Sequence, residues 1–359
     1  MHGDFPDQIT LDGEQVPFTP GETLFEIAKR HGRDIPSLCY DPRLKPLGGC
    51  RLCVVEVEGW PGLAASCTTE ATDGMVVTTD SSRLEKHRRV ILEMVVSEVR
   101  DLEVDPLSGY SSQELSDLVT KYGADTGRFA GKKSGKTRSD DPNPFILRDY
   151  DNCISCYRCV RVCAEQEGDF AITVRNRGFS SQISVEFDGI LKDSSCTFCG
   201  QCVQTCPTGA LADKKALSRR QLPGATKRTR TICPYCGVGC SVDILSRDGK
   251  IVAVQPAMDG PANEGALCVK GQFAWDFVHH PDRLTSPLIR DDNGVLVKAS
   301  WDEALDRAAA GLEKVADQHG PEAIYAIASG RAPNEAAYAV QKLMRAGWGL
   351  NHIDHCARA

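Results

Sequence analysis

The chain has 359 residues, enough for roughly two to three domains, with ordinary contents of hydrophobic (41%) and charged (25%) residues. Its net charge of −7 argues against nucleic acid as a partner, because phosphate binding requires a basic excess. No apolar run approaches the ~20 residues of a membrane span, and the first residues lack the features of a secretion signal. We therefore expect a cytoplasmic protein without a membrane span.

Seventeen cysteines set the composition apart. A disulfide scaffold would be short, secreted and even in cysteine number, whereas this chain is long and its count is odd. In a reducing compartment, clustered thiols are more often metal ligands than disulfides. The cysteines fall at 39–67, 153–206 and 233–268, with Cys356 standing apart. This grouping predicts small metal-binding modules in series, followed by a larger domain.

The first 80 residues predict a small β-rich domain with one helix. Residues 8–18 have the pattern of a hairpin with its turn at Asp12-Gly13, and residues 23–31 that of a helix ended by Gly32. Strands are predicted over 54–58 and 75–78.

The cysteines of this first domain are spaced C-x10-C-x2-C-x13-C, and they are Cys39, Cys50, Cys53 and Cys67. Gly48 and Gly49 precede Cys50 and would let the backbone approach a sulphide and direct N–H groups at it. Four thiolates in a small β domain favour a [2Fe–2S] cluster. The spacing leaves zinc open as the alternative.

The middle of the chain carries the most specific pattern. After a predicted helix over 82–99 and a polar, basic segment over 128–143, interpreted as a solvated linker rather than a docking patch, the spacing C-x2-C-x2-C-x3-C occurs twice. This is the bacterial ferredoxin run, in which the fourth cysteine of each run binds the other cluster. We expect two [4Fe–4S] clusters, one held by Cys153, Cys156, Cys159 and Cys206, the other by Cys196, Cys199, Cys202 and Cys163. Two runs of four argue against a zinc ribbon.

A third group follows a second basic linker, predicted over 212–230. Its spacing is C-x2-C-x3-C-x27-C, formed by Cys233, Cys236, Cys240 and Cys268, and it favours another [4Fe–4S] cluster with zinc as the alternative. Lys270 is either a solvated lysine or a fixed positive charge beside that cluster. After residue 288 longer α/β elements are predicted, namely helices over 301–317 and 334–346 and a strand over 323–328. Cys356, near His352 and His355, is buried filler or part of an incomplete zinc-like site.

Four clusters in one chain predict an electron relay between two remote sites. Several segments also carry a family resemblance. Residues 1–80 resemble, through Ser37-Leu38-Cys39-Tyr40 and Gly49-Cys50-Arg51-Leu52-Cys53, the β-grasp [2Fe–2S] domain of respiratory complex I, iron hydrogenases and NAD-linked formate dehydrogenases. Residues 230–288 resemble, through the run from Cys233 to Cys240 and Gly265-Ala266-Leu267-Cys268-Val269-Lys270-Gly271, the cluster domain of molybdopterin oxidoreductases.

The resemblance implies the catalytic subunit of a molybdenum or tungsten formate dehydrogenase. It also implies an α+β multidomain fold, which we divide as follows: a β-grasp [2Fe–2S] domain (1–82), a helix and linker (83–141), a two-cluster ferredoxin-like domain (142–214), a linker (215–229), a small β-rich [4Fe–4S] molybdopterin oxidoreductase domain (230–288) and the start of an α/β pterin-binding body (289–359). Lys270 would then mediate electron transfer. The H-x3-C-x2-C-x5-C cluster of some relatives is expected to be missing, since residues 97–104 hold no cysteine.

For the full-length enzyme the resemblance implies one [2Fe–2S] cluster, three [4Fe–4S] clusters and a bis-molybdopterin guanine dinucleotide carrying molybdenum or tungsten, with formate and CO2 as substrate and product. The implied partner is a flavin- and NAD-binding diaphorase-type subunit or a ferredoxin. In the family, a Cys-Ala-Arg run like Cys356-Ala357-Arg358 is followed one residue later by the metal-ligating cysteine or selenocysteine. We therefore expect that the chain ends at a misread selenocysteine codon and is inactive alone. The alternatives are a non-catalytic electron-transfer subunit of a dehydrogenase or hydrogenase, and a zinc-rich interaction module.

Overall fold

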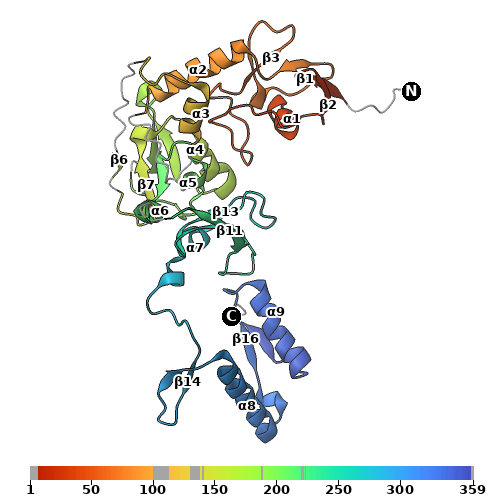
Figure 1. Ribbon diagram of the computed structural model, residues 1–359, viewed down its shortest axis with the longest axis vertical. Coiled ribbons are helices and arrows are strands. Elements are labelled where there is room, and N and C mark those ends of the chain that lie inside the picture. Colours follow the sequence, from red (N-terminus) through yellow and green to blue (C-terminus); the bar gives the residue numbers. More distant parts are fainter. Residues whose placement is uncertain are drawn as a thin grey trace, which may run out of the picture. The chain divides into compact units, whose positions relative to one another are not determined.

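The structure is a computed structural model that describes residues 7–99, 113–129, 138–139, 141–186, 189–219, 222 and 224–356 (Figure 1). The chain divides into two compact units, Met1–Leu222 and Pro223–Ala359, and each is considered by itself. Helices and strands are mixed in both units. The expected multidomain α+β organisation is therefore confirmed.

The first domain of unit 1 is built on a five-stranded sheet with the order β2-β1-β5-β3-β4. The predicted hairpin is confirmed, because β1 pairs antiparallel with β2 around Asp12 and Gly13, both at positive φ. β1 also pairs in parallel with β5 in the middle of the sheet. The bounds are β1 (Gln8–Leu11), β2 (Glu14–Pro17), β3 (Val54–Val57), β4 (Ala64–Ala65) and β5 (Val76–Thr78).

Helix α1 (Leu24–Arg30) packs its apolar side against this sheet. It begins at a capping box, in which the Thr23 hydroxyl accepts from Glu26 N and the Glu26 carboxylate accepts from Thr23 N. It ends at His31, just before Gly32 with φ +72°. The predicted helix is confirmed at both ends.

Two helices lead from the first domain to the ferredoxin-like part of unit 1. The predicted helix is α2 (Ser82–Val96), whose buried Arg88 donates to the carbonyls of Val54 and Thr79 and so fastens α2 to the sheet. The sequence analysis did not predict α3 (Glu114–Tyr122), which packs on α2. Much of the predicted linker (residues 100–112, 130–137 and 140) lies outside the described residues.

The ferredoxin-like part consists of short elements around the two cysteine runs. Its three-stranded sheet has the order β10-β7-β6, and a separate hairpin joins β8 to β9. The bounds are β6 (Arg138–Ser139), β7 (Ile146–Asp149), α4 (Arg158–Val162), a π-helical turn (Cys163–Glu167), β8 (Ile172–Arg175), β9 (Gln182–Val185), α5 (Gln201–Thr205), β10 (Leu211–Asp213) and α6 (Lys214–Arg219). Single 3-10 turns lie at Ser66–Thr68, Tyr150–Asn152, Gly178–Ser180 and Leu191–Asp193.

The predicted basic linker over 212–230 is wrong in part, because it contains α6 and the start of β11. The basic side chains of α6 are compatible with a helix, since the buried Ala216 anchors it and Asp213 accepts the N–H groups of Lys215 and Ala216 at its first turn. The composition of residues 212–230 indicated exposed charges but not the helix and strand that these residues form.

Unit 2 begins with an antiparallel sheet of the order β11-β12-β13, followed by α7. Its remaining elements include the hairpin of β14 and β15 and a parallel pair formed by β16 and β17. The bounds are β11 (Lys227–Ile232), β12 (Ser241–Arg247), β13 (Lys250–Pro256), α7 (Val269–Phe273), a 3-10 turn (Asp276–His279), β14 (Leu288–Arg290), β15 (Leu296–Lys298), α8 (Trp301–His319), a 3-10 turn (Pro321–Ala323), β16 (Ala326–Ala328), α9 (Asn334–Lys342), a π-helical turn (Leu343–Gly347) and β17 (Ile353–His355).

The elements predicted after residue 288 are present with shifted ends. Helix α8 begins at a capping box between Ser300 and Glu303. The predicted strand is shorter than expected, because Pro321–Ala323 form a 3-10 turn and β16 begins only at Ala326. Among the described residues, no helix is long and apolar enough to cross a membrane.

Candidate iron–sulphur cluster sites

All seventeen cysteines lie within the described residues, and none of them forms a disulfide. The sixteen that the sequence groups into cluster sites are mostly buried or half-buried, and Cys268 is the exposed member among them. Thiols that are buried in groups of four, without disulfides, are the donor set that an iron–sulphur cluster needs.

In the first domain, the four cysteines converge from the loop of Cys39, from the loop of Cys50 and Cys53 that leads into β3, and from the 3-10 turn that contains Cys67. Cys53 and Cys67 lie with their sulphur atoms 3.3 Å apart, and Cys50 N donates to the Cys39 sulphur at 3.4 Å. Leu38 N donates to the Cys50 sulphur at the same distance. Hydrogen bonds from Cys39, Leu38 and Leu52 lower the pKa of the Cys50 thiol to about 5 despite its burial. The hydrogen bond shared with Cys50, together with burial, raises the pKa of the Cys39 thiol, so the loop favours a negative charge on the Cys50 sulphur of this pair.

The backbone of this loop takes a conformation that most residues avoid. Gly48 has φ +68°, and a Cβ at this position would lie 3.1 Å from Cγ2 of Thr68, the residue after Cys67. Arg51, between Cys50 and Cys53, has φ 60°. The glycine singled out in the sequence thus lets two cysteine-bearing segments approach each other closely.

The two runs of the ferredoxin-like part wind in the same way. In each run the third and fifth residues have positive φ: Ser155 (53°) and Tyr157 (60°) in one, Phe198 (55°) and Gly200 (77°) in the other. In each run the third residue's N–H also donates to the first cysteine's sulphur at 3.4 Å. Helices α4 and α5 begin directly after the fifth residue. The repeated spacing therefore produces a repeated cradle of thiols and N–H groups.

The fourth cysteine of each run lies with the other run. Cys206 and Cys153 are the thiols that act electrostatically on Cys156, and Cys163 acts on Cys196. A cavity is lined by the first predicted set of thiols together with Tyr150 and Ile154; the thiols are Cys153, Cys156, Cys159 and Cys206. The structure thus brings the cysteines together in the predicted sets. Their role as ligands stays a prediction, which cysteine replacements can test.

Burial controls the acidity of these thiols. It raises the pKa of Cys156 and of Cys199 to about 12 and that of Cys196 to about 11. Burial also raises the pKa values of Cys159 and Cys202 well above the ordinary range of a thiol. Bound iron would reverse this preference, because a coordinating thiol loses its proton to the charge of the metal.

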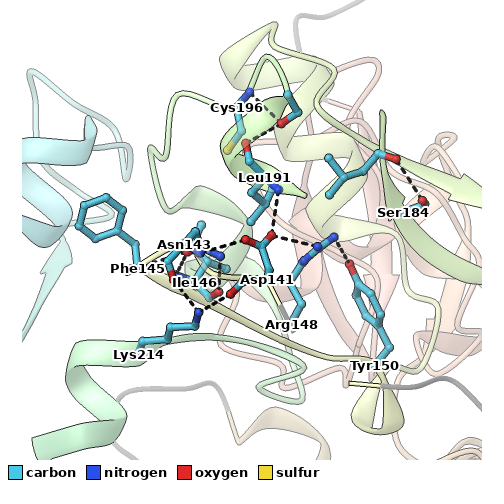
Figure 2. A network of polar contacts seen from close by, with 12 residues as sticks. Asp141, Asn143, Phe145, Ile146, Arg148, Tyr150, Ser184, Leu191, Cys196 and Lys214 are labelled. Carbon is cyan, nitrogen blue, oxygen red and sulfur yellow. Dashed lines mark hydrogen bonds and ion pairs between the residues drawn. The ribbon is translucent and has the colours of Figure 1, made fainter. Parts of the chain in front are cut away.

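A buried polar network supports both runs (Figure 2). The Asp141 carboxylate pairs with Arg148 at 2.9 Å and accepts from Leu191 N at 2.8 Å. Arg148 lies 3.5 Å from the Tyr150 hydroxyl, and Tyr150 lines the cavity of the first run. Leu191 begins the segment that enters the second run, where the Ser194 hydroxyl accepts from Cys196 N. One buried ion pair therefore contacts the lead-in segments of both runs.

The third group lies in unit 2, at one end of the β11-β12-β13 sheet. Cys233 N donates to Cys240 O at 2.8 Å, and Cys268 caps the N-terminus of α7. Burial is the main reason why the pKa of Cys233 is raised. The charges of Cys268 and Cys236 raise it as well, whereas the charge of Lys270 lowers it, so these residues lie close to Cys233. A Cβ at Gly271 would lie 3.6 Å from the Cys233 sulphur. Lys270 is exposed and its charge acts on Cys233. Its role beside a cluster stays a prediction.

Cys356 lies apart from the sixteen and is exposed. Its sulphur accepts from Gly330 N at 3.2 Å, and the Ser329 hydroxyl lies 3.6 Å away. The prediction that Cys356 is buried filler is therefore wrong, because Cys356 directly follows β17, a strand of a two-stranded sheet, and is exposed. Residues 357–359, on which the selenocysteine interpretation rests, lie outside the described residues.

Among the described residues, no three His, Cys, Asp or Glu side chains converge closely enough to hold a single metal ion. The fit to iron–sulphur clusters rests instead on sets of four thiols from separate loops, each bordered by backbone N–H groups. Fold and sites together define an iron–sulphur electron-transfer protein.

Four families match consecutive parts of the chain. They are a 2Fe-2S iron-sulfur cluster binding domain at residues 7–82, the NADH-quinone oxidoreductase subunit 3 ferredoxin-like domain at 143–212, the molybdopterin oxidoreductase Fe4S4 domain at 226–280 and molybdopterin oxidoreductase at 283–359. These matches favour iron–sulphur clusters over zinc. The order of domains agrees with the resemblance found in the sequence.

Three relatives cover nearly all of the chain, each matching 98% of it. They are an NADH-quinone oxidoreductase subunit of Rhizobium meliloti (35% identical), the alpha subunit of NADPH-Fe(3+) oxidoreductase of Geobacter sulfurreducens (36%) and the "Putative formate dehydrogenase" of Staphylococcus haemolyticus (30%). The chain spans about 40% of the length of these relatives. A crystal structure of NAD+-reducing [NiFe]-hydrogenase matches with a TM-score of 0.51 and 32% identity, over 58% of this chain and 87% of the hydrogenase chain.

The chain therefore combines iron–sulphur domains with the start of a molybdopterin oxidoreductase domain. It is similar to the NADH-quinone oxidoreductase subunit of Rhizobium meliloti and to proteins named as formate dehydrogenases.

Sequence reasoning missed the polar residues that support the cysteines. Asp141 falls inside the segment interpreted as a linker, and Arg148 and Tyr150 follow it without a recognisable motif. Asp41, two residues after Cys39, was missed as well. Burial alternates along β7 and places Arg148 inside, but the residues of this strand do not alternate between apolar and polar, so the sequence does not indicate the buried position of Arg148.

Proposed function

We propose that the chain is the iron–sulphur relay and the first part of the pterin-binding body of a formate dehydrogenase. The observation that carries the proposal is the order of domains, because a molybdopterin oxidoreductase Fe4S4 domain and the start of a molybdopterin oxidoreductase body directly follow a relay-type array. A relative named as a formate dehydrogenase matches this order over 98% of the chain.

In this proposal the sixteen grouped cysteines hold one [2Fe–2S] and three [4Fe–4S] clusters. Bound clusters supply one-electron transfer, and the protein sets their spacing and potentials. The Cys268 site would face the pterin, with Lys270 as the positive charge between them. The ferredoxin-like pair would follow, and the Cys39 site would face an NAD- and flavin-binding partner or a ferredoxin.

The pterin guanine dinucleotides and their molybdenum or tungsten belong to the whole enzyme, of which this chain would supply the entry. The residues present fit such an entry. Asn334, at the start of α9, donates to Gly237 O at 2.8 Å, inside the loop that carries Cys236 and Cys240. The start of the α/β body is thus in direct contact with the third cysteine group.

A second candidate is a non-catalytic electron-transfer subunit. It is favoured by the hydrogenase structure, of whose chain 87% is covered, and by the relative named as an NADH-quinone oxidoreductase subunit. In this case the same clusters would join a different donor to an NAD-linked partner.

The choice of electron donor separates the two candidates. We suggest isolating the native complex anaerobically and adding formate, NADH or H2 while following the iron–sulphur signals by electron paramagnetic resonance. Reduction by formate, together with molybdenum or tungsten in the preparation, supports a formate dehydrogenase. Reduction by NADH or H2 without any response to formate would move the assignment to the electron-transfer subunit. A colourless protein loaded with zinc would contradict both.

A further inference from the structure

The loop that follows Cys39 contacts the ferredoxin-like part of the same unit. Asp41 accepts a hydrogen bond from the Thr205 hydroxyl at 2.7 Å, and Arg43 Nη1 lies 3.5 Å from the side-chain oxygen of Gln201. Both partners belong to α5, the helix that carries Cys202.

The same loop also reaches the π-helical turn after α4. Lys45 N donates to the Glu165 carboxylate at 2.9 Å, and the Gln166 side chain donates to Arg43 O at 2.6 Å. Arg161 of α4 donates to Lys45 O. The loop is thus held at its side chains and at its backbone by the ferredoxin-like part.

Asp41 is the central residue of this junction. It is 6% exposed, and its carboxylate accepts four hydrogen bonds, two at each oxygen. Arg43 N and Arg43 Nε each donate to Oδ1 at 3.0 Å, while Arg43 Nη2 and the Thr205 hydroxyl each donate to Oδ2 at 2.7 Å. Since every partner is a donor, an asparagine could not replace the carboxylate without placing an amide N–H against two of them.

The hydrogen bond between Asp41 and Thr205 joins one particular pair of cysteine sets. Asp41 lies two residues after Cys39, and Thr205 directly precedes Cys206. A second contact joins the same two cysteine sets, because Ile154, which follows Cys153, packs against the same apolar cluster as Cys50. These two contacts arrive at the site whose cavity is lined by Cys153 and Cys206. The contacts of the same loop with Glu165 and Gln201 lie beside Cys163 and Cys202.

We propose that Asp41 is a positioning residue for electron exchange between the Cys39 site and the Cys206 site. Its carboxylate fixes, through Thr205, the backbone of two ligand-bearing segments relative to each other. This step rests on the proposed relay function in one respect only, namely that both sites hold clusters. The competing interpretation is that Asp41 and Arg43 merely stabilise the fold.

The test uses the cluster-loaded 359-residue chain. The variants are Asp41→Asn, which places an amide N–H against two of the four donors, Thr205→Val, which removes the hydroxyl donor, and Thr205→Ser, which keeps the hydroxyl. Asp73→Asn is the matched control, since Asp73 is in the same domain, is exposed and accepts one hydrogen bond from Gln8 N at 2.9 Å. The measurements are iron content, the magnetic interaction between the two reduced clusters, and the rate of electron redistribution after rapid reduction.

We expect Asp41→Asn and Thr205→Val to keep their iron but to slow the exchange several-fold and to weaken the magnetic interaction. The combined variant should be no worse than the more severe single one, because both changes disturb the same contact. Thr205→Ser and Asp73→Asn should behave like the unaltered chain. Unchanged exchange and magnetic interaction in both contact variants would overturn the proposal, even if their stability falls. If the unaltered chain takes up no clusters, it is the relay function itself that fails.

Discussion

Arg148 and Asp141 form an ion pair of 2.9 Å in which the side chains are 4% and 1% exposed. Removing one partner of such a pair leaves an uncompensated buried charge, which typically costs about 3–5 kcal/mol. We therefore expect Asp141→Ala to lower the free energy of unfolding by about that amount, as measured by denaturant unfolding of the cluster-loaded chain.

The pair of Arg89 with Glu85, 3.0 Å long and exposed at both ends, provides the contrast. Glu85→Ala should cost only about 0.3–0.5 kcal/mol, because water screens exposed i,i+4 pairs. Equal losses in the two variants would show that the Asp141 pair does not support the cysteine runs as described.

The cysteine sets can be tested by iron content. If Cys156 and Cys206 hold the same cluster, the double variant Cys156→Ser/Cys206→Ser should lose one cluster, about four irons, and no more. In contrast, Cys156→Ser/Cys163→Ser should affect both ferredoxin-type clusters. Iron analysis and electron paramagnetic resonance of the reduced chain measure the difference.

The control is the single variant Cys356→Ser, which should keep all iron, since Cys356 lies outside the four sets. The reverse result, with one cluster lost in Cys156→Ser/Cys163→Ser and both clusters affected in Cys156→Ser/Cys206→Ser, would contradict the crossed assignment. It would favour instead a simple arrangement in which each run holds its own cluster.

The sequence predicted those features that follow from local chemistry. The hairpin at Asp12-Gly13, the capped helix that follows it and the repeated cysteine runs each depend on residues close together in the chain. The runs in particular dictate their own winding, because each places positive φ at the same two positions. Such features can be predicted without knowing the partners of the segment.

The features that were missed depend on residues far apart in the chain. Asp41 meets Thr205 across 164 positions, and Asp141 meets Leu191 across 50. No spacing of residues in the sequence predicts such long-range pairs, and a single aspartate within a polar segment is naturally interpreted as solvated. Helix α6 was missed for a related reason, since its anchor, Ala216, is hidden among basic residues.

A substitution at Gly48 would test how closely the cysteine loops of the first domain approach each other. In Gly48→Ala the new Cβ would meet Thr68 Cγ2 at 3.1 Å, at a φ of +68° that alanine rarely adopts. We expect a loss of roughly 2 kcal/mol or more in stability and a weakened [2Fe–2S] signal in visible absorption. Gly59→Ala is the control, because its φ of +79° is equally unfavourable but nothing lies within 4 Å of the Cβ. It should lose about 1 kcal/mol and keep the signal; a matching loss of signal would show that strain alone disturbs the site.

Because the carboxyl of Asp213 is buried, we expect the stability of the chain to depend on pH. Burial raises its pKa to about 6, although the N–H groups of Lys215 and Ala216 and the charges of Lys215 and Arg219 favour the ionised form. Its second oxygen, Oδ2, has no hydrogen-bond partner among the described residues. The folded chain therefore holds this proton more tightly than the unfolded chain, whose pKa is near 3.8.

The stabilising contribution of protonated Asp213 is complete below the unfolded pKa and is lost as the pH rises through about 6. Between about pH 5 and pH 7, the unaltered chain should therefore lose roughly 1 kcal/mol relative to Asp213→Asn, which has no proton to release. Denaturant unfolding of both chains across this range measures the difference, and Asp80→Asn, at an exposed carboxylate, controls for the removal of one negative charge. A constant difference between the unaltered chain and Asp213→Asn would mean that Asp213 is already ionised at pH 5 and that α6 is held by its charge.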